Sequence, residues 1–156
     1  MYFMSDFDLN LKTILHNYCL EITQEKINRI NTLLKSNQNA LDTATKSSAG
    51  DKHETARAMI HLEQENNSKQ MLEAQKALRI LSQITVEKHS DIKMGSLVRT
   101  DNAIFYISIG LGKHKMNDTE FFAISPVSPL AQKLMGLTEN STLNFNGLIY
   151  TILGIV

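Results

Sequence analysis

Apolar residues recur every three or four positions between about Leu9 and Gln83 of this 156-residue chain, which is the spacing of one helix face. This stretch has no proline and a single glycine, Gly50, near its midpoint. Because the apolar stripe is narrow, the pattern predicts two helices that pair as a coiled coil. The stripe residues are Leu11, Leu15, Tyr18, Ile22, Ile27, Ile30, Leu34 and Leu41 in the first arm, and Ala56, Met59, Ile60, Met71, Ala74, Leu78 and Leu81 in the second.

The turn between the arms is expected around Gly50, within residues 47–54. A glycine just past a helix end can adopt the left-handed conformation that terminates the helix, and Asp51 would then cap the next one. A connection this short makes the arms antiparallel neighbours, each about 50 Å long at roughly 35 residues. Residues 63–70 are almost wholly polar, so the pattern predicts weak pairing and a mobile rod there.

From about Asp91 the pattern changes to short runs with strand character. Asn146-Gly147 between the last two runs is a strong hairpin signal. Ser128 and Pro129 mark the start of one helix, and Gly136 marks its end. The expected strands lie at 96–99, 103–109, 121–125, 143–145 and 148–155, and the expected core is Ile107, Ile124, Leu134, Ile149 and Ile152.

These patterns predict an α+β protein in two parts. Residues 1–90 form a long antiparallel α-helical coiled-coil hairpin, and residues 91–156 form a small α/β sheet domain with a helix packed on it. We find no internal repeat and no low-complexity segment.

Composition narrows the possible partners. The chain has 16 basic and 16 acidic residues, which argues against bare nucleic acid as the main partner but leaves open a protein that handles nucleic acid. No run of about 18 apolar residues and no secretory signal is evident, so no membrane association is expected. Cys19 is the lone cysteine, which fits a reducing, cytoplasmic location.

The candidate chemistry lies at the turn. Asp51 and Glu54 are three residues apart, so both side chains face the same way on a helical first turn. Carboxylates of this kind can share a Mg²⁺ ion, although the same spacing also occurs in a capping box. His53 is either a metal ligand or a solvated turn residue. Cations that could meet RNA phosphates are Lys46, Lys52 and Arg57.

Two stretches resemble the GreA/GreB family of bacterial transcript cleavage factors. Residues 124–136 match a strand that enters a Ser-Pro helix start, followed by a small apolar helix ended by glycine, and residues 141–156 match the two closing strands. At the turn, the family's glycine, both acids and alanine are present as Gly50, Asp51, Glu54 and Ala56. The family's asparagine, further acid and tyrosine are replaced by Thr55, Arg57 and Ala58.

The resemblance implies an FKBP-like C-terminal domain and a hairpin that enters the secondary channel of bacterial RNA polymerase. There Asp51 and Glu54 would assist catalysis by the polymerase, holding a Mg²⁺ ion jointly with it while backtracked RNA is cut. The factor would be a cytoplasmic monomer, would be no enzyme by itself and would carry no cofactor of its own. Its partners would be the polymerase and, near the tip, nascent RNA. The residues expected to bind the polymerase surface are Ser125, Pro126, Ser128 and Pro129.

Other functions stay open at this point. A relative of the family could occupy the channel and modulate or inhibit transcription without cleavage, and the altered residues beside the tip acids keep that variant open. A coiled-coil adaptor that self-associates through the hairpin is a further possibility. A peptidyl-prolyl isomerase is suggested by the fold alone, and fold does not fix function.

Overall fold

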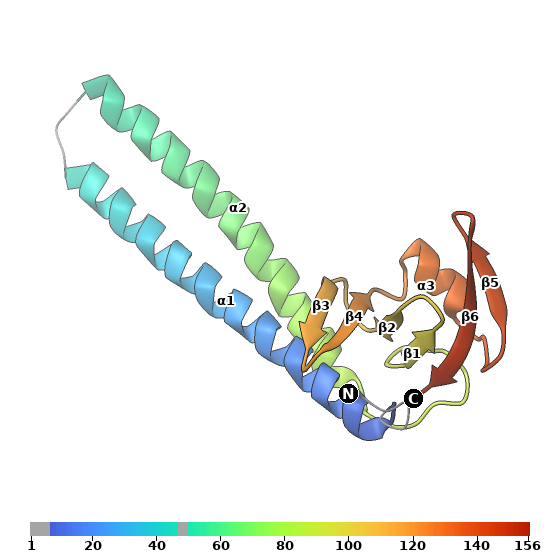
Figure 1. The fold of residues 1–156 in the computed structure, drawn as a ribbon. Helices are drawn as coiled ribbons and strands as arrows, with labels where there is room; N and C mark the ends of the chain where they lie inside the picture. Colours follow the sequence, from blue (N-terminus) through green and yellow to red (C-terminus); the bar gives the residue numbers. More distant parts are fainter. Residues whose placement is uncertain (1–6, 47–49) are drawn as a thin grey trace. The chain divides into compact units, whose positions relative to one another are not determined.

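The structure, a computed structural model, describes residues 7–46 and 50–156 (Figure 1). The predicted α+β fold class is confirmed, because two long packed helices precede a six-stranded mixed sheet. The backbone divides into two compact units. The hairpin unit comprises Glu21–Arg79, and the sheet unit comprises the chain up to Leu20 together with Ile80–Val156. Within the described residues, no helix is apolar enough over a sufficient length to cross a membrane.

The hairpin unit consists of the larger parts of α1 (Leu9–Lys46) and α2 (Gly50–Gln83), which run antiparallel (Figure 1). Its buried residues follow the alternating three- and four-residue steps of a coiled-coil seam, as the sequence predicts. The buried apolar cluster contains Ile27 and Ile30 from α1 and Met71 and Ala74 from α2, with Leu34 and Leu78 packed against it.

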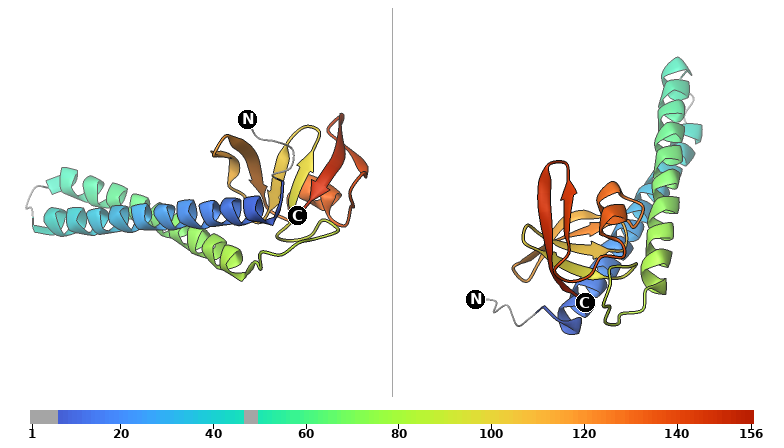
Figure 2. Two further views of the ribbon diagram at one scale, coloured as in Figure 1. Left: turned by 60° about the horizontal axis from the view of Figure 1, so that its bottom comes forward. Right: turned by 90° about the vertical axis from the view of Figure 1, so that its right-hand side faces the viewer.

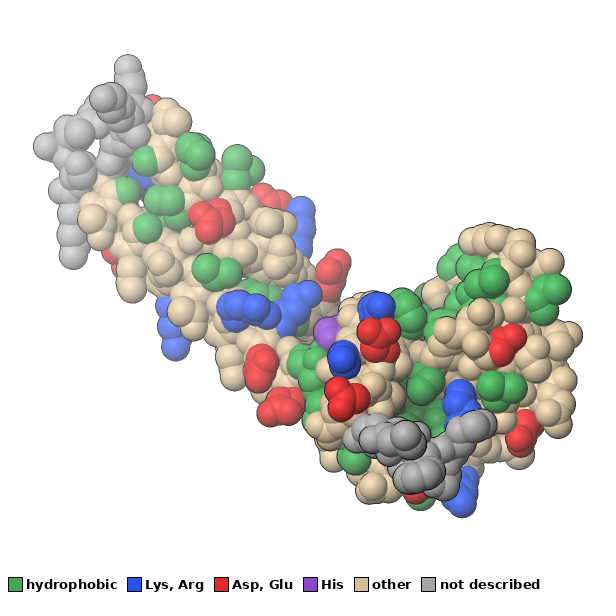
Figure 3. Space-filling model, viewed as in Figure 1, with side chains coloured by type: hydrophobic (Ala, Val, Ile, Leu, Met, Phe, Trp, Pro, Cys, Tyr) green, Lys and Arg blue, Asp and Glu red, His purple; other side chains and the backbone are tan. Residues whose placement is uncertain are grey.

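Some apolar side chains of the hairpin lie outside this seam (Figure 3). The sequence pattern placed Met59 in the stripe, but its side chain is 66% exposed, so that assignment is wrong. Met59 and Ile60 are 100° apart around the helix, and Ile60 is the residue that is half-buried. Ala56 is also exposed. Leu33, Leu62 and Leu72 are exposed as well.

The sheet unit contains six strands in the order β3-β4-β2-β1-β6-β5 (Figure 2). β2 and β4 are parallel, and the other neighbours are antiparallel. The strands are β1 (Leu97–Thr100), β2 (Ile104–Ile107), β3 (Gly112–Met116), β4 (Thr119–Ile124), β5 (Thr142–Phe145) and β6 (Leu148–Ile155). The Asn146-Gly147 hairpin is confirmed, since both residues have positive φ between β5 and β6.

Strand β3 is absent from the sequence-based expectation. It lies at an edge of the sheet, pairs only with β4 and carries mostly polar residues, so it has no alternation of buried positions. The signal that could have identified it is Asn117-Asp118. Both residues have positive φ, as in the tight turns that join antiparallel strands.

Helix α3 (Pro129–Leu134) covers one face of the sheet and completes the core. Three predicted core residues, Ile107, Leu134 and Ile152, are fully buried, and Ile124 packs against them. Ile149 is 60% exposed, so its assignment to the core is wrong. Successive residues of a strand face opposite sides of the sheet, so Ile149 and Ile152 of β6 point in different directions.

The opposite face of the sheet receives the first turns of α1, within the same unit. The ring of Tyr18 contacts that of Phe121, and the hydroxyl of Tyr106 lies 2.6 Å from Nδ1 of His16. Leu15 is also fully buried. The sheet is therefore covered on both faces, by α3 and by the start of α1.

Candidate functional site

The predicted tip lies where α1 ends at Lys46 and α2 begins at Gly50. The turn was expected at Gly50, with Asp51 as the cap of the second helix. In the structure Gly50 is already the first residue of α2, so Asp51 belongs to the first turn of the helix and is not its N-cap. Residues 47–49, where the break falls, lie outside the described residues.

The two tip acids are both on the first turns of α2. Glu54 is exposed and has no ion-pair partner among the described residues. The side chains of Asp51 and His53, like those of Lys46 and Lys52, lie outside the described set. Spacing alone places positions 51 and 54 on one side of the helix.

A metal ion at the tip stays a prediction, because the side chains of Asp51 and His53 lie outside the described set. Among the side chains that the structure describes, no three His, Cys, Asp or Glu come close enough to hold a metal by themselves. Mg²⁺ requires octahedral oxygen coordination and is usually held by one or two carboxylates together with water and substrate phosphates. An exposed, unpaired Glu54 beside Asp51 could supply part of such a set.

Two residues of the predicted binding segment at 125–129, Ser125 and Ser128, have a mainly structural role. Ser128 caps α3, since its Oγ accepts a hydrogen bond from the N–H of Ala131 and donates one to the carbonyl of Ser125 at 2.7 Å. The Oγ of Ser125 accepts from the N–H of Val127 at 3.3 Å. Pro129 is the first residue of α3. These contacts fix the loop and direct other residues outward.

Pro126 lines a groove of about 600 Å³ in the sheet unit. Val127, which the sequence reading missed, follows it and is 74% exposed. Apolar residues and residues of both charges line the groove. Its lining therefore has the mixed polarity that is typical of protein–protein interfaces. The other residues that line it are Ile80, Gln83, Ile84, Thr85, Glu87, His89, Lys93 and Met94.

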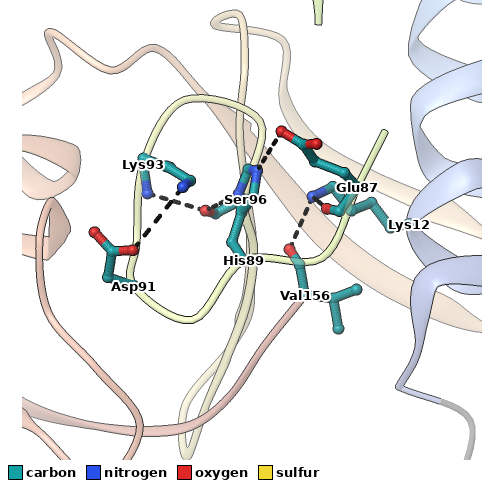
Figure 4. A network of polar contacts seen from close by, with 7 residues as sticks. All are labelled: Lys12, Glu87, His89, Asp91, Lys93, Ser96 and Val156. Atoms are coloured by element: carbon teal, nitrogen blue, oxygen red, sulfur yellow. Dashed lines mark hydrogen bonds and ion pairs between the residues drawn. The ribbon is translucent and has the colours of Figure 1, made fainter. Parts of the chain in front are cut away.

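A polar network fixes the segment that follows α2 (Figure 4). The buried ammonium of Lys12 donates to the carbonyls of Glu87 at 2.6 Å and Val156 at 3.0 Å. Burial lowers the pKa of Lys12 to about 8, while attraction to the Glu87 carboxylate partly opposes the shift. The network therefore joins the start of α1 to the loop at 87 and to the last strand.

The same network places Ser96, His89 and Glu87 in a row that superficially resembles a catalytic triad. The Oγ of Ser96 lies 2.7 Å from Nδ1 of His89, whose Nε2 lies 3.9 Å from the Glu87 carboxylate. Ser96 is wholly buried and its Oγ accepts the N–H of Lys93. A substrate cannot reach this hydroxyl. The contacts among Ser96, His89 and Glu87 therefore serve to position the loop that lines the groove.

His16 and His89 are both buried and lose basicity. Burial, followed by repulsion from Lys12, lowers the pKa of His16 below its usual 6.5. Burial also lowers the pKa of His89, where Lys12 and Lys93 add to the effect and the carboxylates of Glu87 and Asp91 oppose it. The folded sheet unit therefore binds fewer protons at these sites than the unfolded chain does.

We expect the sheet unit to lose stability as the pH falls from about 7.5 to about 5, because protons bind the unfolded state in preference. His16→Gln keeps a polar partner for Tyr106 but cannot titrate, so its loss should be smaller. Urea unfolding followed by tyrosine fluorescence measures this, since the tyrosines that the structure describes, Tyr18, Tyr106 and Tyr150, belong to the sheet unit. The exposed His61→Gln variant is the control. Equal acid sensitivity in wild type and His16→Gln would contradict the expectation.

The fold thus defines a class of protein, a two-helix hairpin joined to a six-stranded sheet unit, with two acids, Asp51 and Glu54, near the junction of the helices. No protein-family model and no curated protein matches the sequence.

Two solved structures are similar to this chain. One is GreA factor homolog 1 (Gfh1) of Thermus thermophilus, with 16% identity, coverage of 88% of this chain and 94% of that chain, and a TM-score of 0.36. The other is described as the transcription factor Gfh1, with 16% identity, coverage of 88% and 92%, and a TM-score of 0.35. These values describe a likeness between chains and assign neither an activity nor a partner to this one.

Proposed function

We propose that this protein binds bacterial RNA polymerase and acts through its secondary channel, into which the hairpin inserts. The observation that carries the proposal is the position of the Gly50-Asp51-x-x-Glu54 segment at the junction of two long antiparallel helices. A coiled-coil hairpin is a stiff, slender element, and it ends here in two acids. The GreA/GreB-like residues at the tip and at 124–136 support RNA polymerase as the partner.

In this proposal the sheet unit binds the polymerase surface through Pro126, Val127 and the groove beside them. Pro126 and Val127 are held by the Ser125 and Ser128 hydrogen bonds, so little conformational entropy is lost when the loop binds. The exposed apolar side chain of Val127 offers surface that gains from burial. The hairpin then needs few contacts of its own.

The tip acids would contribute to cleavage of backtracked RNA inside the polymerase active centre. Mg²⁺, when held there jointly with the polymerase, supplies stabilisation of charge on the reacting phosphate oxygens. Asp51 and Glu54 bring negative charge on a helix whose direction is fixed by the seam. The nuclease activity in this proposal belongs to the polymerase, and this chain adds ligand charge and orientation.

A second candidate function is modulation or inhibition without cleavage, and Arg57 favours it. Arg57 is exposed, lies three residues after Glu54 and has no ion-pair partner among the described residues. Residues three apart on a helix are neighbours, so its charge opposes the approach of a second cation. The same charge would attract RNA or nucleotide phosphate.

Stalled, backtracked elongation complexes distinguish the two functions. If the tip supports cleavage, added protein shortens the 3′ end of the RNA in the presence of Mg²⁺ faster than polymerase alone. If the protein occupies the channel without cleavage, the RNA is cut no faster and nucleotide addition slows. No effect on either reaction would contradict both.

A further inference from the structure

The seam of the hairpin carries two buried asparagines where a coiled coil would place apolar residues. Asn37 is the first seam position beyond Leu34 on α1, and Asn67 is the seam position before Met71 on α2. Their side chains are 7% and 6% exposed. Neither Nδ2 group has a hydrogen-bond partner among the described residues. Each arm therefore loses one apolar seam contact and buries an unmet donor in its place.

Two buried donors without partners favour separation of the helices around these two seam positions. In the closed hairpin each Nδ2 group has given up its hydrogen bonds to water and gained none in return, and that cost is recovered when the arms part. Helical hydrogen bonds run within each arm, so the arms can separate while both remain helical. The asparagines thus bias a specific part of the seam toward opening.

The apolar contacts are distributed unequally on the two sides of the asparagines. Toward the sheet unit, six apolar residues of the cluster hold α1 and α2 together. Toward the tip, the described seam retains Leu41, which is buried, and Ile60, which is half-buried, with the polar Gln64 half-buried between Ile60 and Asn67. Little apolar surface opposes opening on the tip side.

We infer that the seam positions of Asn37 on α1 and Asn67 on α2 divide the hairpin into a proximal section that stays paired and a distal section that opens and closes as a unit. The proximal section is the cluster region at 27–34 and 71–78, and the distal section is 38–46 with 54–66. The inference concerns the hairpin alone and holds whichever partner the protein has. Glu54 lies on the section that opens and therefore moves with it. The binding cavity of a partner can then select the hairpin conformation whose tip it accommodates.

Hydrogen–deuterium exchange on the full-length chain, read by mass spectrometry, tests the inference. In wild type, backbone amides of the distal section should exchange at least about tenfold faster than those of the proximal section, because fewer apolar contacts resist their opening. In the double variant Asn37→Leu/Asn67→Leu, distal exchange should slow by about tenfold or more while proximal exchange stays the same.

The matched control is Asn39→Leu/Asn66→Leu, which makes the same chemical change at two exposed helix positions. It carries the same gain in helix propensity and should leave the difference between the sections unchanged. If the leucine seam variant associates into dimers, seen by light scattering, the comparison of the two sections in wild type still decides.

Two results would overturn the inference. One is equal protection of the distal and proximal amides in wild type. The other is a monomeric leucine seam variant with distal exchange as fast as in wild type, which would mean that the two asparagines do not cause the opening, as when bound water satisfies their amides.

Discussion

Replacing both tip acids, Asp51→Asn with Glu54→Gln, is expected to reduce stimulated RNA cleavage by at least about 10–100-fold, the loss that even indirect changes at metal sites cause. Both substitutions keep the size of the side chain and remove the negative charge that Mg²⁺ requires. Binding to the polymerase should survive, because the docking surface is proposed on the sheet unit. The measurement is the cleavage rate of backtracked complexes at saturating factor.

A purely structural role of the acids predicts a different result. Asp51 lies in the first turn of α2, where an acid gains about 0.3–1 kcal/mol from the helix dipole, so the double variant should lose little stability. Glu63→Gln, at an exposed position of the same helix, is the matched control and should cleave like wild type. Full cleavage by the double variant would refute the metal-holding role and leave the acids as parts of a helix start.

Truncation of the sheet core is expected to be the most destabilising single change. Ile152 is fully buried in the cluster that contains Val98, Phe105 and Leu134. Ile152→Ala should lower the free energy of unfolding by about 2–5 kcal/mol, because transfer and cavity costs add. Urea denaturation followed by tyrosine fluorescence reports on the sheet unit, to which the described tyrosines belong.

The control for this substitution lies on the same strand. Ile149→Ala removes the same atoms from a side chain that is 60% exposed and should cost less than about 1 kcal/mol. Equal losses for the two variants would show that both side chains share the core, contrary to the alternation along β6.

The hairpin could be predicted from the sequence because its determinants are local. Helical spacing of apolar residues and the absence of proline define the arms, and the polar stretch at 63–70 already indicates weak pairing. The phase errors at Met59 and Ile149 share a cause. Met59 is next to the half-buried Ile60 on α2, and Ile149 shares β6 with the buried Ile152. Only packing against the partner helix or the neighbouring strand decides which residue of each pair faces inward.

The polar contacts of the sheet unit could not be predicted, because they join residues far apart in the chain. Lys12 meets Glu87 and Val156, and His16 meets Tyr106. No local pattern marks a lysine that the fold will bury. The tip acids differ from these contacts, because Asp51 and Glu54 could be identified from their spacing along one short segment. Their proposed activity depends on a partner.

The central claim is that this protein binds RNA polymerase, and capture of purified bacterial core polymerase on the immobilised full-length chain tests it most directly. We expect saturable capture by wild type and at least about tenfold weaker capture by Val127→Asp, since hot-spot side chains contribute on this scale. Leu148→Asp, which also places an aspartate at an exposed apolar position but on β6, should capture like wild type. Absence of capture, with a stable dimer that dissolves only when the hairpin is deleted, would contradict the account and identify a coiled-coil adaptor.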